Sequence, residues 1–235
     1  MEKEVKCRYS RQIAVKEVGI VGQESLLRSK VAIVGCGALG SMVAMQLAGA
    51  GVGRLCIADF DTVDVSNLQR QLFFKESEAG ESKSLLVAKR ISELNKGVSV
   101  DCMECIVTSG MAENMLMDCD FVVDATDNPS SKLMIERVCR KLGKPYCIGG
   151  VSGFRGQVMT VVGGYGFEEV FAGIPESEST QSPANRGVTG PAAAFCASYQ
   201  SSEVIKYLVS QRKDCERSSL FVFDLYCNSF QHFRV

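Results

Sequence analysis

Apolar and polar positions alternate regularly from residue 30 onward, with short apolar runs separated by stretches of helical spacing. This alternation predicts the strands of a parallel sheet joined by crossover helices. The predicted strands lie at 30–34, 54–58, 98–106, 120–124 and 145–149, and the predicted helices at 38–50, 82–95, 109–117 and 129–142. Asn128 and Pro129 mark the start of the last helix, because a capping residue followed by proline is typical of a helix N-terminus.

The pattern is less regular on both sides of this core. Gly19 and Gly22 interrupt the helical spacing of residues 8–29, which predicts an arm of short helices. After Gly150 we predict a strand at 157–162, a long polar loop, a helix of small residues at about 190–210, and closing strands at 219–225 and 229–235. We therefore expect one α/β domain with an arm (1–29), a core (30–150), a loop (164–187) and a C-terminal helix with added strands (188–235).

Composition and charge exclude several classes of protein. The 235 residues are 46% hydrophobic and 23% charged, as in an ordinary globular domain, and the net charge of -1 provides no basic field for nucleic acid or anionic lipid. Residues 31–53 carry no charge, but their six glycines fit a strand, a turn and a helix better than a membrane span. The charged start lacks a secretory signal, and eleven scattered cysteines indicate reduced, buried thiols, so we expect a cytoplasmic protein.

A glycine-rich loop follows the first predicted strand and opens a helix, which is the context of the dinucleotide fingerprint in a Rossmann-like sheet with helices on both faces. It reads Gly35-Cys36-Gly37-Ala38-Leu39-Gly40. The glycines allow a tight turn and let phosphate approach the free N–H groups of the helix end. Asp59 follows the next strand, 19 residues after Gly40, where an acid accepts hydrogen bonds from ribose hydroxyls. The alternative is a turn that only packs a helix on a strand, with Asp59 as a surface acid.

Polar side chains are dense from Asp59 to Gln71, and Asp61 lies among them. A short helical turn would place Asn67, Arg70 and Gln71 on one side, where the cation would meet phosphate. Lys83 lies near the start of the next helix, a position that opposes the helix dipole unless an anion is brought there. The alternative is that Arg70 and Lys83 are solvated surface charges.

Asp127 and Asn128 follow a predicted strand, at the carboxyl edge where open α/β sheets bind their ligands. Because Mg²⁺ is often held by one or two carboxylates together with phosphate oxygens, Asp127 is a candidate magnesium ligand. The alternative is that Asp127 caps the helix that begins at Pro129, a role that Asn128 fills equally well.

Several motifs in register resemble the ThiF/MoeB/HesA family, the bacterial relatives of ubiquitin-activating enzymes. They comprise residues 8–12 (Arg-Tyr-Ser-Arg-Gln), the glycine-rich loop, residues 59–61, residues 66–71, Lys83 and residues 126–128. The resemblance covers residues 8–150 in order and continues more weakly to the end of the chain. It is more specific than the glycine-rich loop alone, because separate motifs coincide.

The resemblance implies an ATP-dependent adenylyltransferase. The C-terminal carboxylate of a ubiquitin-like sulfur carrier ending in Gly-Gly, of the ThiS or MoaD type, would attack the α-phosphate of Mg-ATP to form an acyl-adenylate and pyrophosphate. It implies a homodimer in which Arg11 reaches the ATP of the partner subunit. From the charge balance we expect no binding of nucleic acid or membrane. The implied catalytic residues are Arg11, Arg70, Lys83 and Asp127 (which would also hold Mg²⁺), and the implied nucleotide-binding residues are Gly35, Gly37, Ala38, Gly40, Asp59, Asp61, Asn67, Gln71 and Asn128.

The sequence departs from the family pattern at its cysteines. Both Cys-x-x-Cys pairs of a structural zinc site are missing, and the only such spacing, Cys102 to Cys105, has no second pair, so we expect no zinc. The stretch 181–187 contains no cysteine, and Cys196 lies among small apolar residues, so we expect a buried thiol and no obligatory cysteine-linked intermediate. The loop at 164–187 would be the family's crossover segment, which covers the tail of the carrier.

Other functions compatible with the sequence remain as alternatives. Thiamine synthesis is the preferred pathway, with molybdopterin synthesis, or a peptide or RNA base as the acceptor, as alternatives. An NAD-dependent oxidoreductase would explain the glycine-rich loop and Asp59, but it would leave Asn67, Arg70, Lys83 and Asp127 without a role. A non-catalytic scaffold would keep the fold without the chemistry.

Overall fold

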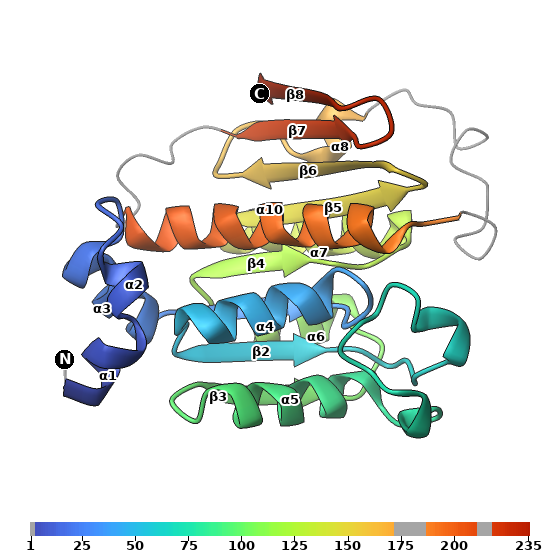
Figure 1. The fold of residues 1–235 in the computed structure, drawn as a ribbon. Helices are drawn as coiled ribbons and strands as arrows, with labels where there is room; N and C mark the ends of the chain where they lie inside the picture. Colours follow the sequence, from blue (N-terminus) through green and yellow to red (C-terminus); the bar gives the residue numbers. More distant parts are fainter. Residues whose placement is uncertain (1–2, 172–186, 211–217) are drawn as a thin grey trace.

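The computed structural model describes residues 3–171, 187–210 and 218–235, and its central feature is one mixed sheet of eight strands (Figure 1). The strands are β1 (Lys30–Val34), β2 (Arg54–Ala58), β3 (Ser99–Met103), β4 (Phe121–Asp124), β5 (Tyr146–Ser152), β6 (Arg155–Val161), β7 (Ser219–Asp224) and β8 (Ser229–Arg234). Their order in space is β3-β2-β1-β4-β5-β6-β7-β8. This arrangement confirms the predicted mostly parallel, Rossmann-like sheet with strands added at its C-terminal side.

The first five strands are parallel, and their order reverses between β1 and β4. The chain runs outward from β1 to β3 and then returns to the other side of β1 as β4. Crevices that bind ligands in open α/β sheets lie beyond the carboxyl ends of the strands at such a reversal. The fold therefore points to the segments that follow β1 and β4, which contain the glycine-rich loop and Asp127.

Helices cover both faces of the sheet, as predicted. The helices α4 (Gly40–Ala50), α5 (Lys83–Leu94) and α10 (Gly190–Val209) lie on one face, and α6 (Ser109–Leu116) and α7 (Pro129–Leu142) lie on the other (Figure 1). Because successive side chains of a strand point to opposite faces, β1 divides its residues between two cores. Val31 and Ile33 join the core under α4, α5 and α10, while Ala32 and Val34 join the core under α6 and α7.

The N-terminal arm consists of three short helices, α1 (Lys3–Arg8), α2 (Ser10–Ile13) and α3 (Gly19–Arg28), which confirms its prediction. The side-chain amides of Gln12 and Gln23 donate hydrogen bonds to the carbonyl oxygen of Ala50, at 2.9 and 3.0 Å. Since Ala50 is the last residue of α4, the arm packs at the amino edge of the parallel strands, opposite the glycine-rich loop (Figure 1).

Some predicted boundaries in the second half are wrong. The strand predicted at 145–149 continues to Ser152, and the strand predicted at 157–162 begins at Arg155, because residues 150–152 pair with residues 155–157 in a hairpin. The strand predicted at 98–106 ends at Met103. The predicted loop at 164–187 contains the short helix α8 (Phe167–Val170), and its residues 172–186 lie outside the described residues. No helix within the described ranges is long and apolar enough to cross a membrane.

Candidate functional site

The glycine-rich loop between β1 and α4 is shaped by close backbone packing. Gly35 has a φ of 92°, and a side chain there would place its Cβ 2.8 Å from the carbonyl oxygen of Ala125. A Cβ at Gly40 would lie 1.8 Å from the carbonyl oxygen of Gly35, a distance that no other residue tolerates. A Cβ at Gly37 meets only the side-chain amide of Gln71 within 4 Å, at 3.6 Å. The first and third glycines are therefore required by packing, while Gly37 leaves the loop open toward a ligand.

The N-terminus of α4 lies at this opening. Leu39 is its N-cap residue and makes no side-chain capping hydrogen bond, and Ala38 precedes it in the turn. The first turn of a helix has N–H groups without intrahelical partners, and the helix dipole makes this end partly positive. The loop and helix end thus form a site suited to a phosphate group, as the sequence predicts.

Asp59, directly after β2, is hydrogen-bonded to the glycine-rich loop. Its carboxylate accepts the backbone N–H of Cys36 through one oxygen and the backbone N–H of Asp61, at 2.7 Å, through the other. Burial raises the pKa of the Asp59 carboxyl, although these N–H groups and the nearby charge of Lys83 act in the opposite direction. A carboxylate has further lone pairs after these two bonds, so Asp59 can still accept a hydrogen bond from a ribose hydroxyl.

Lys83 is the first residue of α5 and is only 4% exposed. Its ammonium group pairs with a carboxylate oxygen of Asp61 at 3.0 Å, and the Asp61 side chain is 54% exposed. The structure therefore contradicts the view of Lys83 as a solvated surface charge. A buried cation at the positive end of a helix is unfavourable unless an anion lies near it, and its recorded anionic partner is itself largely in solvent.

The segment of residues 65–71 begins with a short 3₁₀ helix, η1 (Val65–Asn67), whose N-cap is the Asp64 side chain. Asn67 and Arg70 are half-buried, and a guanidinium N–H of Arg70 donates to the carbonyl oxygen of Ser66 at 3.2 Å. Gln71 is buried beside Gly37, and no partner is recorded for its Oε1 atom among the described residues. This orphaned acceptor next to the open side of the loop is consistent with a polar ligand there.

The capping role that the sequence left open between Asp127 and Asn128 belongs to Asn128. The Oδ1 atom of Asn128 accepts the backbone N–H of Ser131 at 2.8 Å and the hydroxyl of Ser130 at 2.8 Å, so Asn128 caps α7. Asp127 does not cap this helix; its carboxylate is exposed, and no partner is recorded for it within the described segments. Its oxygens therefore fit the magnesium role that the sequence predicts, because they are accessible at the carboxyl edge of β4.

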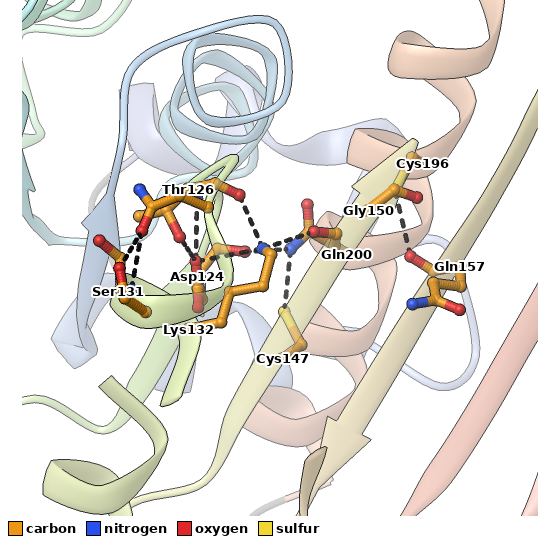
Figure 2. A network of polar contacts seen from close by, with 12 residues as sticks. Asp124, Thr126, Ser131, Lys132, Cys147, Gly150, Gln157, Cys196 and Gln200 are labelled. Atoms are coloured by element: carbon orange, nitrogen blue, oxygen red, sulfur yellow. Dashed lines mark hydrogen bonds and ion pairs between the residues drawn. The ribbon is translucent and has the colours of Figure 1, made fainter. Parts of the chain in front are cut away.

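Behind this turn lies a buried polar network that the sequence analysis did not predict (Figure 2). The ammonium group of Lys132 donates to the carbonyl oxygens of Thr126 at 2.7 Å and Gly149 at 2.8 Å, and it lies 3.5 Å from Oδ1 of Asp124. The side-chain amide of Gln200, on α10, donates to the carbonyl oxygen of Asp124 at 3.0 Å. A signal was present, because Lys132 and Glu136 are charged residues at helical spacing from Ile135 and Cys139 on the buried face of α7.

The structure does not bring Arg11 to the other candidate residues. Arg11 is exposed on α2. The neighbouring Gln12 is bonded to the C-terminus of α4, whereas the glycine-rich loop precedes the N-terminus of that helix. With 11 residues at about 1.5 Å each, α4 separates the two by roughly 16 Å. Within one chain Arg11 is too far away to reach a nucleotide, so its predicted role requires a second subunit.

Two of the cysteines near the candidate site, Cys196 and Cys36, are fully buried. Cys196 is fully buried on α10, and burial raises the pKa of its thiol to about 12, as expected for an inert cysteine. Cys36 is also fully buried in the glycine-rich loop, and burial again raises its pKa. Cys7 and Cys227 are exposed, which corrects the expectation that the thiols are buried throughout. Across residues 3–171, 187–210 and 218–235, no three potential ligands cluster as a metal site.

Comparisons with known proteins agree with this geometry. Residues 9–235 match the family model described as the ThiF family. The "Adenylyltransferase and sulfurtransferase MOCS3" of Dictyostelium discoideum is 35% identical over 230 residues, which cover 97% of this chain and 54% of that protein. The "Sulfur carrier protein adenylyltransferase" of Thermus thermophilus is 35% identical over 235 residues, covering 97% of this chain and 86% of that protein.

A solved structure of Escherichia coli MccB with ATP shares the fold. Its TM-score is 0.80 at 18% identity, and the alignment covers 100% of this chain and 71% of that chain. This chain spans about half the length of the MOCS3 proteins that it matches, at 54% and 52%.

Proposed function

Because this chain belongs to the ThiF family, we propose that it is an ATP-dependent adenylyltransferase that activates the C-terminal carboxylate of a ubiquitin-like sulfur carrier. The carboxylate attacks the α-phosphate of ATP, so that an acyl-adenylate forms and pyrophosphate leaves. The sulfur carrier protein adenylyltransferase of Thermus thermophilus, of which this chain covers 86%, supports the carrier as the acceptor class.

The observation that carries this proposal is the position of Lys83. Its buried ammonium group lies at the N-terminus of α5, beside Asp59 and Asp61, at the edge of the sheet where the glycine-rich loop opens. A nicotinamide cofactor would use the glycine-rich loop and Asp59, with its two phosphates bound at the end of α4. It has no further phosphate that could pair with the buried ammonium group of Lys83. A triphosphate extends past that end and supplies the missing anion.

Each candidate residue would have a distinct role in this reaction. Gly37 and the end of α4 would receive phosphate oxygens, Asp59 would hold the ribose, and Arg70 and Lys83 would offset negative charge on the leaving pyrophosphate. Asp127 would hold Mg²⁺, which supplies further positive charge when it is bound. The reaction needs no general base, because a carboxylate is already ionised near pH 7.

We also propose a subunit arrangement and a pathway for this reaction. Arg11 completes the site of the partner subunit in a homodimer, because it lies at the opposite edge of its own sheet. The arm, core, loop and C-terminal segment then act as one cytoplasmic adenylation domain. We place the carrier in thiamine synthesis.

Pyrophosphate–ATP exchange on the purified protein with Mg²⁺ tests the proposal. Exchange is expected only when a small carrier ending in Gly-Gly is present, and a carrier truncated before this end is the matched control. Carriers of the ThiS and MoaD types, compared in parallel, test the pathway. Binding of NAD in place of ATP, or ATP binding without exchange for any carrier, would contradict the proposal.

A further inference from the structure

Lys132 connects three parts of the molecule through a single ammonium group. Its acceptors are the carbonyl oxygen of Thr126 in the turn after β4, the carbonyl oxygen of Gly149 in β5, and the Asp124 carboxylate at the end of β4 (Figure 2). Two of its N–H donors make hydrogen bonds to carbonyl oxygens, and the ammonium group also forms an ion pair with Asp124. Lys132 is 9% exposed and its charge is directed to protein acceptors, which distinguishes it from Lys83.

The turn that Lys132 holds ends in one unpartnered carboxylate. Thr126 is fixed from both sides, since its N–H and hydroxyl donate to Asp124 at 2.9 and 2.7 Å while its carbonyl oxygen accepts from Lys132. The next residue is Asp127, and the residue after that, Asn128, is fixed as the cap of α7. Both neighbours of Asp127 are therefore immobilised, whereas its own side chain has no recorded partner among the described residues. A carboxylate held in this way is preorganised.

Stability alone explains this network poorly. Replacing a buried ion pair by apolar residues of similar volume is often neutral or stabilising. Glu136 provides a comparison on the same face of α7, four residues further along. It is fully buried and accepts hydrogen bonds from the Tyr146 hydroxyl at 2.9 Å and the Glu168 N–H at 3.0 Å, so it holds α8 and not the turn.

We propose that Lys132 is a positioning residue, which fixes the Asp127 carboxylate at the carboxyl edge of the sheet by tying the carbonyl oxygen of Thr126 to β5. The role of Asp127 as the magnesium ligand rests on the proposed function. The immobilisation of the turn does not depend on it.

The test uses the double variant Asp124→Asn/Lys132→Met. The single change Lys132→Met would leave the buried carboxylate of Asp124 without its cation and threaten folding, whereas the double variant removes both charges. We expect hydrogen exchange of the amides at 126–128 to become at least about tenfold faster in the absence of nucleotide. We also expect the Mg²⁺ concentration that half-saturates pyrophosphate–ATP exchange to rise about 10- to 100-fold, as for other residues that support metal ligands.

Two comparisons separate positioning from a general loss of structure. Glu136→Gln disturbs the same helix but should leave amide exchange at 126–128 and the Mg²⁺ requirement unchanged. The triple variant Asp124→Asn/Lys132→Met/Asp127→Asn should have the same pyrophosphate–ATP exchange rate as Asp127→Asn alone. Once the Asp127 carboxylate is removed, loss of the residues that position it has no further effect. Unchanged amide exchange at 126–128, or additive losses in this cycle, would overturn the inference. If the wild-type protein shows no pyrophosphate exchange, the proposed function fails, and amide exchange still decides the role of Lys132.

Discussion

Replacement of Lys83 by methionine should separate catalysis from stability. The side chain that loses its partner, Asp61, is 54% exposed and becomes solvated, so no unpaired charge is buried by the change. Methionine also matches the length of the apolar part of lysine and suits the buried position. We therefore expect the free energy of unfolding to change by no more than about 1 kcal/mol, as for other ion pairs with an exposed member.

The rate of carrier-dependent pyrophosphate–ATP exchange should fall much further. A positioned donor that meets charge developing in the transition state typically contributes a factor of about 10²–10³, or about 3–4 kcal/mol. Exchange rates at saturating carrier and ATP measure this loss, and urea unfolding measures stability. Lys89→Met is the matched control, because Lys89 lies on the same helix and is exposed. Full activity in Lys83→Met, or an equal loss in both variants, would refute the reasoning.

Alanine at the two glycines of α4 should have opposite effects on stability. Gly40→Ala should lower the free energy of unfolding by about 1–3 kcal/mol, since its Cβ would lie 1.8 Å from the carbonyl oxygen of Gly35. Gly49→Ala lies on the same helix, and the nearest atom to its Cβ would be 3.9 Å away. This change should raise the free energy of unfolding by about 0.5–1 kcal/mol. Both effects are measured by urea unfolding.

Arg11→Ala and Asp127→Ala proteins should each be inactive alone, but mixing them should restore about a quarter of the wild-type exchange rate if the sites are composite. After subunit exchange, half of the dimers contain one variant of each kind, and one of the two sites in such a dimer is intact. No recovery after subunit exchange would exclude action across the dimer. Burial raises the pKa of Glu136, so this residue favours the folded state less as the pH rises through the range between its ordinary and raised pKa. The stability of the wild type relative to Glu136→Gln should accordingly fall in urea unfolding as the pH rises above the ordinary glutamate pKa of about 4.3, and a rise would contradict this sign.

The sequence could predict the glycine-rich loop, Asp59 and Lys83 because each follows from local rules. The loop lies between a buried strand and a helix. Asp59 directly follows the next strand, and Lys83 begins the helix after that strand. Spacing along the chain and the meeting of strand ends at one edge were enough to bring them together. The partner of Lys83 could not be predicted, because Asp61 is 22 residues away along the chain and their pairing depends on how the segment between them folds.

The hairpin at β5 and β6 shows why other boundaries were missed. Gly149 and Gly150 suggest the end of a strand, since glycine weakens strands. In the fold, a Cβ at Gly149 would lie 2.6 Å from both the Gln200 side chain and Leu39, so this glycine lets α10 and α4 approach β5. Gln200 is 51 residues away along the chain, and no local pattern records such a contact.

Two lysines with nearly equal burial illustrate what the structure adds to the sequence. Lys83 and Lys132 are 4% and 9% exposed, and both lie in the first turn of a helix beside the same edge of the sheet. Lys132 has two carbonyl acceptors and the Asp124 carboxylate as partners, whereas Lys83 has one recorded partner, which solvent can replace. Burial alone would assign them the same role. The partners separate a cation that acts on phosphate from one that positions a carboxylate. They predict that Lys83→Met lowers the exchange rate at saturating Mg²⁺, whereas Asp124→Asn/Lys132→Met raises the Mg²⁺ requirement.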